Sequence, residues 1–384
     1  LADQTVLVRD GRVAWVGPAA RAELPAGATR IDGRGKFLMP GLAEMHAHVP
    51  PQQNATEEQL RDLMFLYVAN GVTTIRGMLG APYQLRLREQ LASGAILGPQ
   101  FFVAAPSLNG NSAPDPATAA RLVREHAAAG YDLVKLHPGL SRASYDAAVE
   151  AAREAGITLG GHISLDVGLD RTLEARQGSI DHLDGYFEAL TPDSLRASAQ
   201  PNALPLGRVI AGTRATDEQL RALARRTKEA GVWNVPTVYL WESFFGAEDP
   251  ATIAALPEMR YVSPMMVQGW VTQKRNRMNA DAQNAVTPEL AAHYLTLRRR
   301  VLKALADEGA PLLMGTDSPQ MFNVPGFALH REVVVMQEAG VPAYTVLESG
   351  TRNVARYARE VLGKADDFGA VAVGKRADLV LLDA

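Results

Sequence analysis

The sequence contains no cysteine. Disulfides, thiolate nucleophiles and cysteine-ligated zinc are therefore excluded, so any bound metal must be held by nitrogen and carboxylate ligands. Histidine occurs 8 times, which leaves nitrogen ligands available.

The chain also lacks an excess of charge and a long apolar run. It carries 39 basic and 42 acidic residues, a net charge of −3, so we expect no nucleic-acid partner.

No apolar run approaches the roughly 20 residues that span a bilayer, so we expect a soluble protein without a membrane partner. No signal-peptide pattern stands at the start. The chain begins at Leu1 rather than Met, which leaves a cytoplasmic and an exported protein open.

The 384 residues are 47% hydrophobic, which excludes a disordered chain. Two β-rich segments, 5–17 and 369–382, stand at the ends, and Asp10-Gly11 is typical of a two-residue hairpin turn. Because an isolated pair of strands is only marginally stable, we expect both ends of the chain to meet in one small β-domain.

Between these ends, short apolar runs alternate with amphipathic stretches every 25 to 35 residues or so, which is typical of βα units around a parallel sheet. Several amphipathic stretches stop at glycine, namely Gly130, Gly156 and Gly231. Eight such units favour a closed (β/α)8 barrel over an open sheet. The predicted strands lie near 42–48, 72–76, 100–105, 132–136, 157–162, 179–183, 233–238 and 311–316.

The interval 239–310 is about twice as long as a normal unit and contains an insertion at about 240–300. Trp, Phe and Met residues occur in it beside a basic run, Lys274, Arg275 and Arg277. Two interpretations stay open: extra helices packed on the barrel rim, or a lid over the substrate.

Met45-His46-Ala47-His48 ends the first predicted barrel strand. Side chains two apart on a strand point the same way, so His46 and His48 can share one metal ion. Later strands also end in polar residues, where a barrel places its chemistry. These residues are Lys135, His162, His182 and Asp317. Each alone fits an ordinary polar residue, but together they follow one geometric rule.

Lys135 departs from a simple mononuclear site. An ammonium group inside a metal-lined barrel is repelled and desolvated, which favours the free amine. A free amine can take up carbon dioxide and become a carbamate, an anionic ligand able to bridge two cations. The alternative is a lysine paired with a nearby carboxylate.

The order H-x-H, Lys, His, His, Asp, preceded by F-L-M-P-G-L and followed by G-K-R-A-D-L-V-L-L-D, resembles the metal-dependent amidohydrolase superfamily. Within it, the chain is most similar to the imidazolonepropionase/prolidase-like group. The likeness spans residues 5–383 and includes G-V-T-T-I-R (71–76) and T-R-N-V-A-R (351–356). S-L-N-G-N-S (107–112) stands where some relatives carry Gly-Gly-His, and R-G (76–77) stands where they often carry R-D.

The resemblance implies an α/β fold, a distorted TIM (β/α)8 barrel with a small β-sandwich domain from both termini. The implied domains are the barrel, 40–360, and the two parts of the sandwich, 1–39 and 361–384. It also implies two divalent metal ions, most simply zinc. His46, His48 and Asp317 would hold the buried ion, His162 and His182 the exposed one, and carboxylated Lys135 would bridge them with a hydroxide.

The leading hypothesis is a binuclear zinc hydrolase that cleaves an amide bond of a small molecule, a peptide-like or N-acyl amino acid substrate, by attack of the bridging hydroxide. Asp317 would be the general acid and base. Three alternatives stay open: an esterase, lactonase or phosphotriesterase; a mononuclear deaminase or cyclic amidohydrolase; and a non-catalytic metal-stabilised barrel. A homo-oligomer also stays open.

Several residues outside the ligand set are candidates for substrate binding. His137 lies two residues beyond Lys135, and Tyr186, Tyr239 and His330 follow predicted strands. If the insertion is a lid, Lys274, Arg275 and Arg277 would bind an anionic end of the substrate. For each residue the competing interpretation is packing or solvent exposure.

Overall fold

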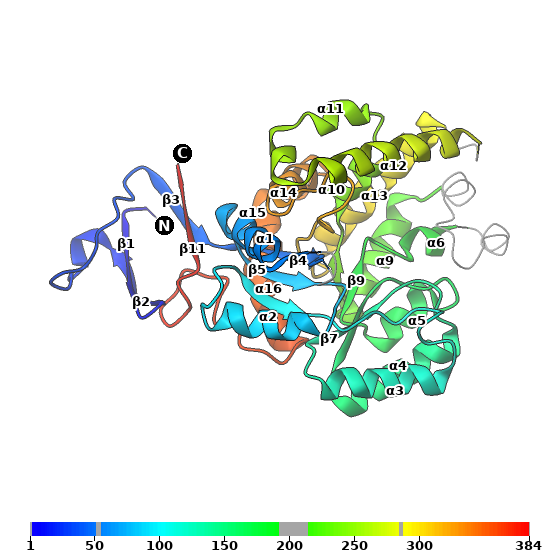
Figure 1. Cartoon of the computed structure of the whole chain (residues 1–384), viewed down its shortest axis with the longest axis horizontal. Coiled ribbons are helices and arrows are strands. Elements are labelled where there is room, and N and C mark those ends of the chain that lie inside the picture. Colours follow the sequence, from blue (N-terminus) through cyan, green and yellow to red (C-terminus); the bar gives the residue numbers. More distant parts are fainter. Residues whose placement is uncertain (1, 51–54, 192–213, 284–286, 384) are drawn as a thin grey trace.

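The computed structural model describes residues 2–50, 55–191, 214–283 and 287–383 as an α/β fold with parallel sheets (Figure 1). Seven of the predicted barrel strands are present, in one sheet of order β4-β5-β6 and one of order β10-β9-β8-β7. Their bounds are β4 Leu42–Ala47, β5 Val72–Gly77, β6 Gln100–Val103, β7 Leu133–Leu136, β8 Thr158–Gly161, β9 Ser179–Asp181 and β10 Trp233–Val235.

Backbone contacts link the two sheets at β6 and β7, where Ala104 and Leu133 form a parallel bridge. The eighth predicted strand, 311–316, forms no regular strand, yet it is bonded on both sides. On one side Leu313 donates to the carbonyl of Asn234 in β10 (2.8 Å), and on the other Met45 of β4 donates to Met314 (2.9 Å). Its regularity is lost because the Thr316 N–H donates to the Glu44 carboxylate (2.8 Å).

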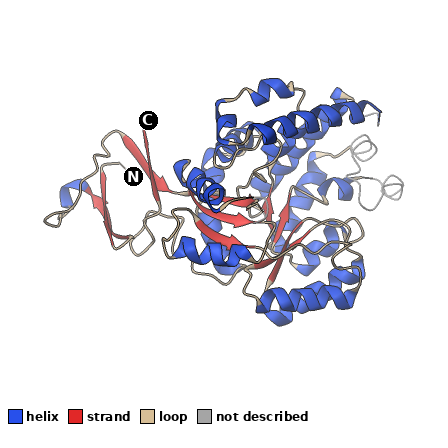
Figure 2. Cartoon of the chain, viewed as in Figure 1, coloured by secondary structure: helices blue, strands red, loops and turns tan. Residues whose placement is uncertain are grey.

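Helices surround the strands of the two parallel sheets, as Figure 2 shows. Before the insertion they are α1 Glu57–Ala69, α2 Tyr83–Ala92, α3 Pro116–Ala128, α4 Arg142–Ala155, α5 Gly168–Ala175, α6 Tyr186–Leu190 and α9 Asp217–Ala230; after it they are α14 Phe327–Glu338, α15 Ala343–Ser349 and α16 Arg352–Glu360. Two of the predicted glycine ends are confirmed, since α4 and α9 are capped by Gly156 and Gly231 in the left-handed conformation.

Long-range pairing joins the two ends of the chain. Strands β1 Gln4–Arg9 and β2 Arg12–Pro18 form an antiparallel hairpin, and both turn residues, Asp10 and Gly11, have positive φ, as predicted. Strand β3 Lys36–Pro40 pairs antiparallel with β11 Leu379–Asp383. Figure 1 shows these strands beside both termini, away from most helices. The described strands form two-stranded sheets here, so the sandwich stays a prediction.

The insertion is helical where the structure describes it. It comprises α10 Val238–Phe245, α11 Pro250–Ala254, a 3-10 helix Pro257–Tyr261, α12 Pro264–Gln283 and α13 Pro288–Glu308. An apolar cluster that includes Ile253, Met259 and Trp270 packs against Phe322 and Val324, which follow the eighth barrel segment. Among the described helices, none combines the length and the apolar character that crossing a bilayer requires.

Candidate active site

His46, His48 and Asp317 converge at one point. His46 lies on β4, His48 follows the strand, and Asp317 follows the segment paired with it. Asp317 Oδ1 lies 2.6 Å from His48 Nε2 and 3.5 Å from His46 Nε2. Potential ligand atoms of the three residues all lie within 4.8 Å of one another, a spacing that suits one metal ion.

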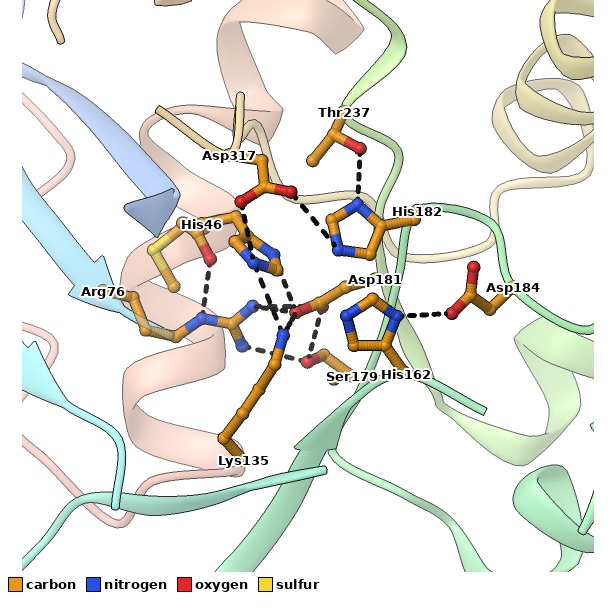
Figure 3. A network of polar contacts seen from close by, with 12 residues as sticks. His46, Arg76, Lys135, His162, Ser179, Asp181, His182, Asp184, Thr237 and Asp317 are labelled. Atoms are coloured by element: carbon orange, nitrogen blue, oxygen red, sulfur yellow. Dashed lines mark hydrogen bonds and ion pairs between the residues drawn. The ribbon is translucent and has the colours of Figure 1, made fainter. Parts of the chain in front are cut away.

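His162 and His182 lie beside this group, after β8 and β9. Their rings are stacked with centroids 4.6 Å apart, and the His182 centroid lies 4.5 Å from that of His46. His182 Nε2 is 3.7 Å from Asp317 Oδ2, as Figure 3 shows. The structure therefore brings together all the histidines predicted as ligands.

Three residues that sequence reasoning missed lie beside these rings, and two of them, Asp184 and Thr237, form hydrogen bonds that orient His162 and His182. Asp181 Oδ2 lies 2.9 Å from His46 Nδ1, Asp184 Oδ2 is 2.7 Å from His162 Nδ1, and Thr237 Oγ1 is 2.8 Å from His182 Nδ1 (Figure 3). A partner at Nδ1 leaves Nε2 for a metal, which is the usual arrangement around ligating histidines. The motif D-H-L-D around His182 could have indicated both aspartates, whereas Thr237 has no signal in the sequence.

Lys135 is fully buried on β7. Its Nζ lies 3.4 Å from His46 Nε2 and 3.7 Å from Asp181 Oδ2. Burial lowers the pKa of Lys135, against the opposing charges of Asp181 and Asp317.

Asp181 already has a cationic partner, the buried Arg76, at 3.2 Å. Arg76 also donates to the Met45 carbonyl (2.7 Å) and to the Tyr357 hydroxyl (2.8 Å). Burial alone would raise the pKa of Asp181, but the charges of Arg76 and Lys135 bring it below its ordinary value. Arg76 would therefore still pair with Asp181 if Lys135 lost its proton.

The site favours neutral imidazoles. Burial, and then the positive charges of neighbouring groups, holds the pKa values of His46 and His182 well below the ordinary value. Neutral imidazole is the form that binds metals. Asp317 Oδ1 is buried without a well-aligned hydrogen bond, although His48 is close. This donor set of neutral nitrogens and one carboxylate fits a divalent metal.

Backbone strain accompanies these residues. His182 and Asp317 have φ values of 62° and 64°, and Thr237 has a φ of 46°. Side chains other than glycine rarely adopt this left-handed conformation, and it is concentrated at functional sites.

Of the residues predicted to bind substrate, His137 lies at the site. Its ring stacks on that of His162 with centroids 4.9 Å apart, and its Nδ1 is buried without a hydrogen-bond partner. Burial lowers the pKa of His137 to about 3, so the ring is neutral. Tyr239 is partly buried at the start of α10, where Glu332 accepts its backbone N–H.

Two predictions need correction. Tyr186 is buried, and its hydroxyl pairs with Thr227 (2.8 Å) and donates to Asn234 (2.9 Å), so it is used inside the core. His330 is exposed on α14, and its Nε2 lies 3.0 Å from the Asn70 carbonyl. It therefore makes a contact at the surface and was wrongly predicted to bind substrate.

The prediction for the basic run in α12 also needs correction. Lys274 is buried and donates to the Ser243 carbonyl (2.8 Å), and the Arg277 guanidinium lies over the rings of Phe244 and Phe245 (4.5 and 4.1 Å). Both residues hold α12 against α10. Lys274 does so through its hydrogen bond, and Arg277 through the attraction between its positive charge and the π-electrons of the two rings. Arg275 is exposed, and its role stays a prediction.

A cavity of about 910 Å³ lies among the 139–142 loop, α5, α6 and α9. Its wall includes Ile163 and Gly185, which directly follow His162 and Asp184 in the sequence. The predicted metal ligands are not among its lining residues, so the cavity is separate from the cluster.

Comparisons with known proteins agree with this geometry. Residues 37–384 match the family model described as the amidohydrolase family. An imidazolonepropionase of Saccharopolyspora erythraea is 31% identical over 106 residues, 26% of this chain and 27% of that relative. The chain thus matches well under two thirds of this relative's length.

Solved structures show the same fold. The structure described as a bottromycin amidohydrolase superimposes with a TM-score of 0.69 at 24% identity, covering 99% of this chain and 77% of that one. A Xaa-Pro dipeptidase with bound methionine gives 0.64 at 19% identity, covering 99% and 88%. These matches place the strand-end cluster of histidine and aspartate in a TIM-barrel-like α/β fold. Because the family model covers residues 37–384, the chain belongs to the amidohydrolase family.

Proposed function

We propose that this protein is a binuclear zinc hydrolase that cleaves the amide bond of a dipeptide or an N-acyl amino acid. One observation carries the proposal: His162 and His182 have Nδ1 bound to Asp184 and Thr237, which leaves Nε2 for metal, and the Nε2 atoms of His46, His48 and His182 lie 2.6–3.7 Å from Asp317.

In this proposal His46, His48 and Asp317 would hold one ion, and His162 and His182 would hold the other. Lys135, once carboxylated, would be a ligand common to both, and its buried amine near neutral imidazoles favours this modification. When bound, a metal pair supplies a hydroxide nucleophile at neutral pH and polarises the scissile carbonyl.

Asp317 moves the proton. Its carboxylate accepts the proton that the nucleophile releases as the new C–O bond forms, and donates it to the leaving nitrogen as the C–N bond breaks. Asp317 suits this role because Oδ1 is buried and lacks a well-aligned hydrogen bond.

The proposed substrate interactions lie around this centre. His137, whose buried Nδ1 has no partner, is positioned to hold a polar group of the substrate, and Tyr239 and the exposed Arg275 extend the surface at the insertion. We also propose that the backbone links of segment 311–318 to β10 and β4 complete a distorted (β/α)8 barrel of residues 40–360. Residues 1–39 and 361–384 then form the β-sandwich domain.

A mononuclear cyclic amidohydrolase or deaminase is the second candidate. It is favoured by the His46, His48 and Asp317 group, which could bind an ion by itself, and by the relatives called imidazolonepropionase and adenine deaminase. In that case Lys135 stays an amine near Asp181.

Metal analysis of the purified protein separates the two. About two zinc equivalents per chain, with a carbon dioxide adduct on Lys135 in intact mass spectra under native conditions, supports the binuclear proposal; one equivalent without the adduct supports the second. A screen of N-acyl amino acids and dipeptides against cyclic amides, esters and phosphotriesters then tests the bond that is cleaved.

A further inference from the structure

Arg298, on α13, is a buried cation beside the histidine cluster that the proposed reaction does not use. It is 1% exposed, and its charge acts at longer range on the buried carboxylates of Glu188 and Glu332. Its guanidinium lies 4.3 Å from the Trp241 ring centroid, and its Nη1 donates to the Tyr294 hydroxyl (2.9 Å). A buried charge whose hydrogen bonds go to neutral groups requires a specific reason for its position.

The other end of the guanidinium binds two backbone carbonyls. Nη2 donates to the carbonyl of His182 (2.6 Å) and, more weakly, to that of Pro236 (3.3 Å). The first carbonyl belongs to the peptide between His182 and Leu183, and the second to the peptide that enters Thr237. All three of these residues, His182, Leu183 and Thr237, have a positive φ, of 62°, 55° and 46°.

The same two segments are also joined through their side chains, since His182 Nδ1 and Thr237 Oγ1 are 2.8 Å apart. One guanidinium therefore links the carbonyl of His182 to that of Pro236, the residue before Thr237, whose side chain binds His182. Left-handed backbone persists only where its surroundings hold it, and here the described donor to the His182 carbonyl is Arg298.

We propose that Arg298 is a positioning residue that holds the strained ends of β9 and β10 so that His182 presents Nε2 to the metal. This inference rests on the proposed function, in which His182 is a ligand. In this proposal α13, the last helix of the insertion, supports the metal site through the contact of Arg298 with the His182 carbonyl.

Zinc retention against a graded chelator, in the full chain, tests the proposal with three variants. Arg298→Met removes all donors, Arg298→Lys keeps one short donor, and Tyr294→Phe removes the hydroxyl that Arg298 contacts while leaving both carbonyl contacts. We expect Arg298→Met to release one of the two zinc equivalents at about 10- to 100-fold lower chelator, the usual range for groups that orient ligands. Arg298→Lys should lie between it and the wild type, and Tyr294→Phe should resemble the wild type.

The melting temperature of the metal-free variants separates positioning from stability. Positioning predicts that the rise in Tm on adding zinc shrinks in Arg298→Lys by more than in Tyr294→Phe, whatever the metal-free Tm. If Arg298→Met does not fold, Arg298→Lys decides the question, together with Thr237→Val, which removes the side-chain tie and should weaken the same equivalent.

Wild-type zinc retention in both Arg298→Lys and Thr237→Val, with two equivalents in the wild type, overturns the inference and leaves the proposed function standing. An equal loss in Tyr294→Phe also overturns it, because packing alone would then account for the effect. A wild-type chain that binds no metal overturns both proposals.

Discussion

The metal centre and the insertion differ in how their residues are placed. The proposed ligands of the centre come from β7, from the ends of β4, β8 and β9, and from segment 311–318, where parallel strands bring side chains to one edge. Basic residues of the insertion, Lys274 and Arg277, instead turn inward and fasten α12 to α10. The position of a side chain at a strand end can therefore be predicted from the strand's period. Whether a charged side chain of the insertion is buried or exposed depends instead on how its helices pack.

The largest effect is expected from Asp317→Asn. An amide cannot accept the proton of the nucleophile, so kcat for amide hydrolysis should fall by about 10²- to 10⁴-fold, the usual contribution of a general acid or base. Steady-state kinetics with zinc content measured in parallel checks this. Near-normal turnover at full zinc occupancy would contradict a proton-transfer role for Asp317. The strand-end residues would then differ from those of the insertion in position only, not in catalytic function.

Two buried lysines give a matched test of the comparison. Lys135→Met should release at least one zinc equivalent, because the proposed bridging ligand is gone. Lys274→Met should keep zinc and lower the free energy of unfolding by about 1–3 kcal/mol, because the Ser243 carbonyl loses its buried donor. Zinc analysis and urea unfolding check both. Equal zinc loss in the two variants would contradict the division between centre and insertion.

A smaller, pH-dependent effect is expected at Glu332, which accepts the N–H groups of Val238 (2.9 Å) and Tyr239 (2.7 Å) and so ties α10 to α14. Burial raises the pKa of Glu332 from 4.5 to about 8. The folded state therefore binds the proton more tightly, and this contribution to stability is complete below pH 4.5 and is lost as the pH rises to about 8.

Glu332→Gln has no proton to lose. Relative to the wild type, its Tm should therefore improve steadily between pH 5 and pH 8, as read from parallel thermal melts of metal-free protein. A difference in Tm that stays constant over this range would show that Glu332 does not titrate there.

The smallest effect is expected from Arg275→Gln. Arg275 is exposed, so a contact with a substrate carboxylate would be screened by water, and the KM for carboxylate substrates should rise only a few-fold with kcat unchanged. Arg277→Gln serves as the control and should act on stability, since Arg277 covers the rings of α10. An unchanged KM for Arg275→Gln would leave the insertion without a substrate-binding cation among the three predicted.

Much of the parallel sheet could be predicted because its signals are local. Alternating apolar runs locate seven barrel strands, and glycines locate the ends of α4 and α9. The position of the eighth strand could be predicted, but its irregular pairing could not. Thr316 binds the side chain of Glu44, which is distant in the sequence. Tyr186 was misplaced for the same reason: its partners, Thr227 and Asn234, come from other elements.

The sequence by itself determined the chemistry that is available: no cysteine, a His-x-His pair, and lysine, histidine and aspartate at the ends of successive strands. These follow from residue type and from the period of a strand, which need no knowledge of distant neighbours. Only the tertiary structure decided which groups lie against the proposed ligands, namely Asp181, Asp184, Thr237 and Arg298. Contacts such as that of Arg298 with His182 join residues far apart along the chain, and they exist only once the helices have packed around the strands.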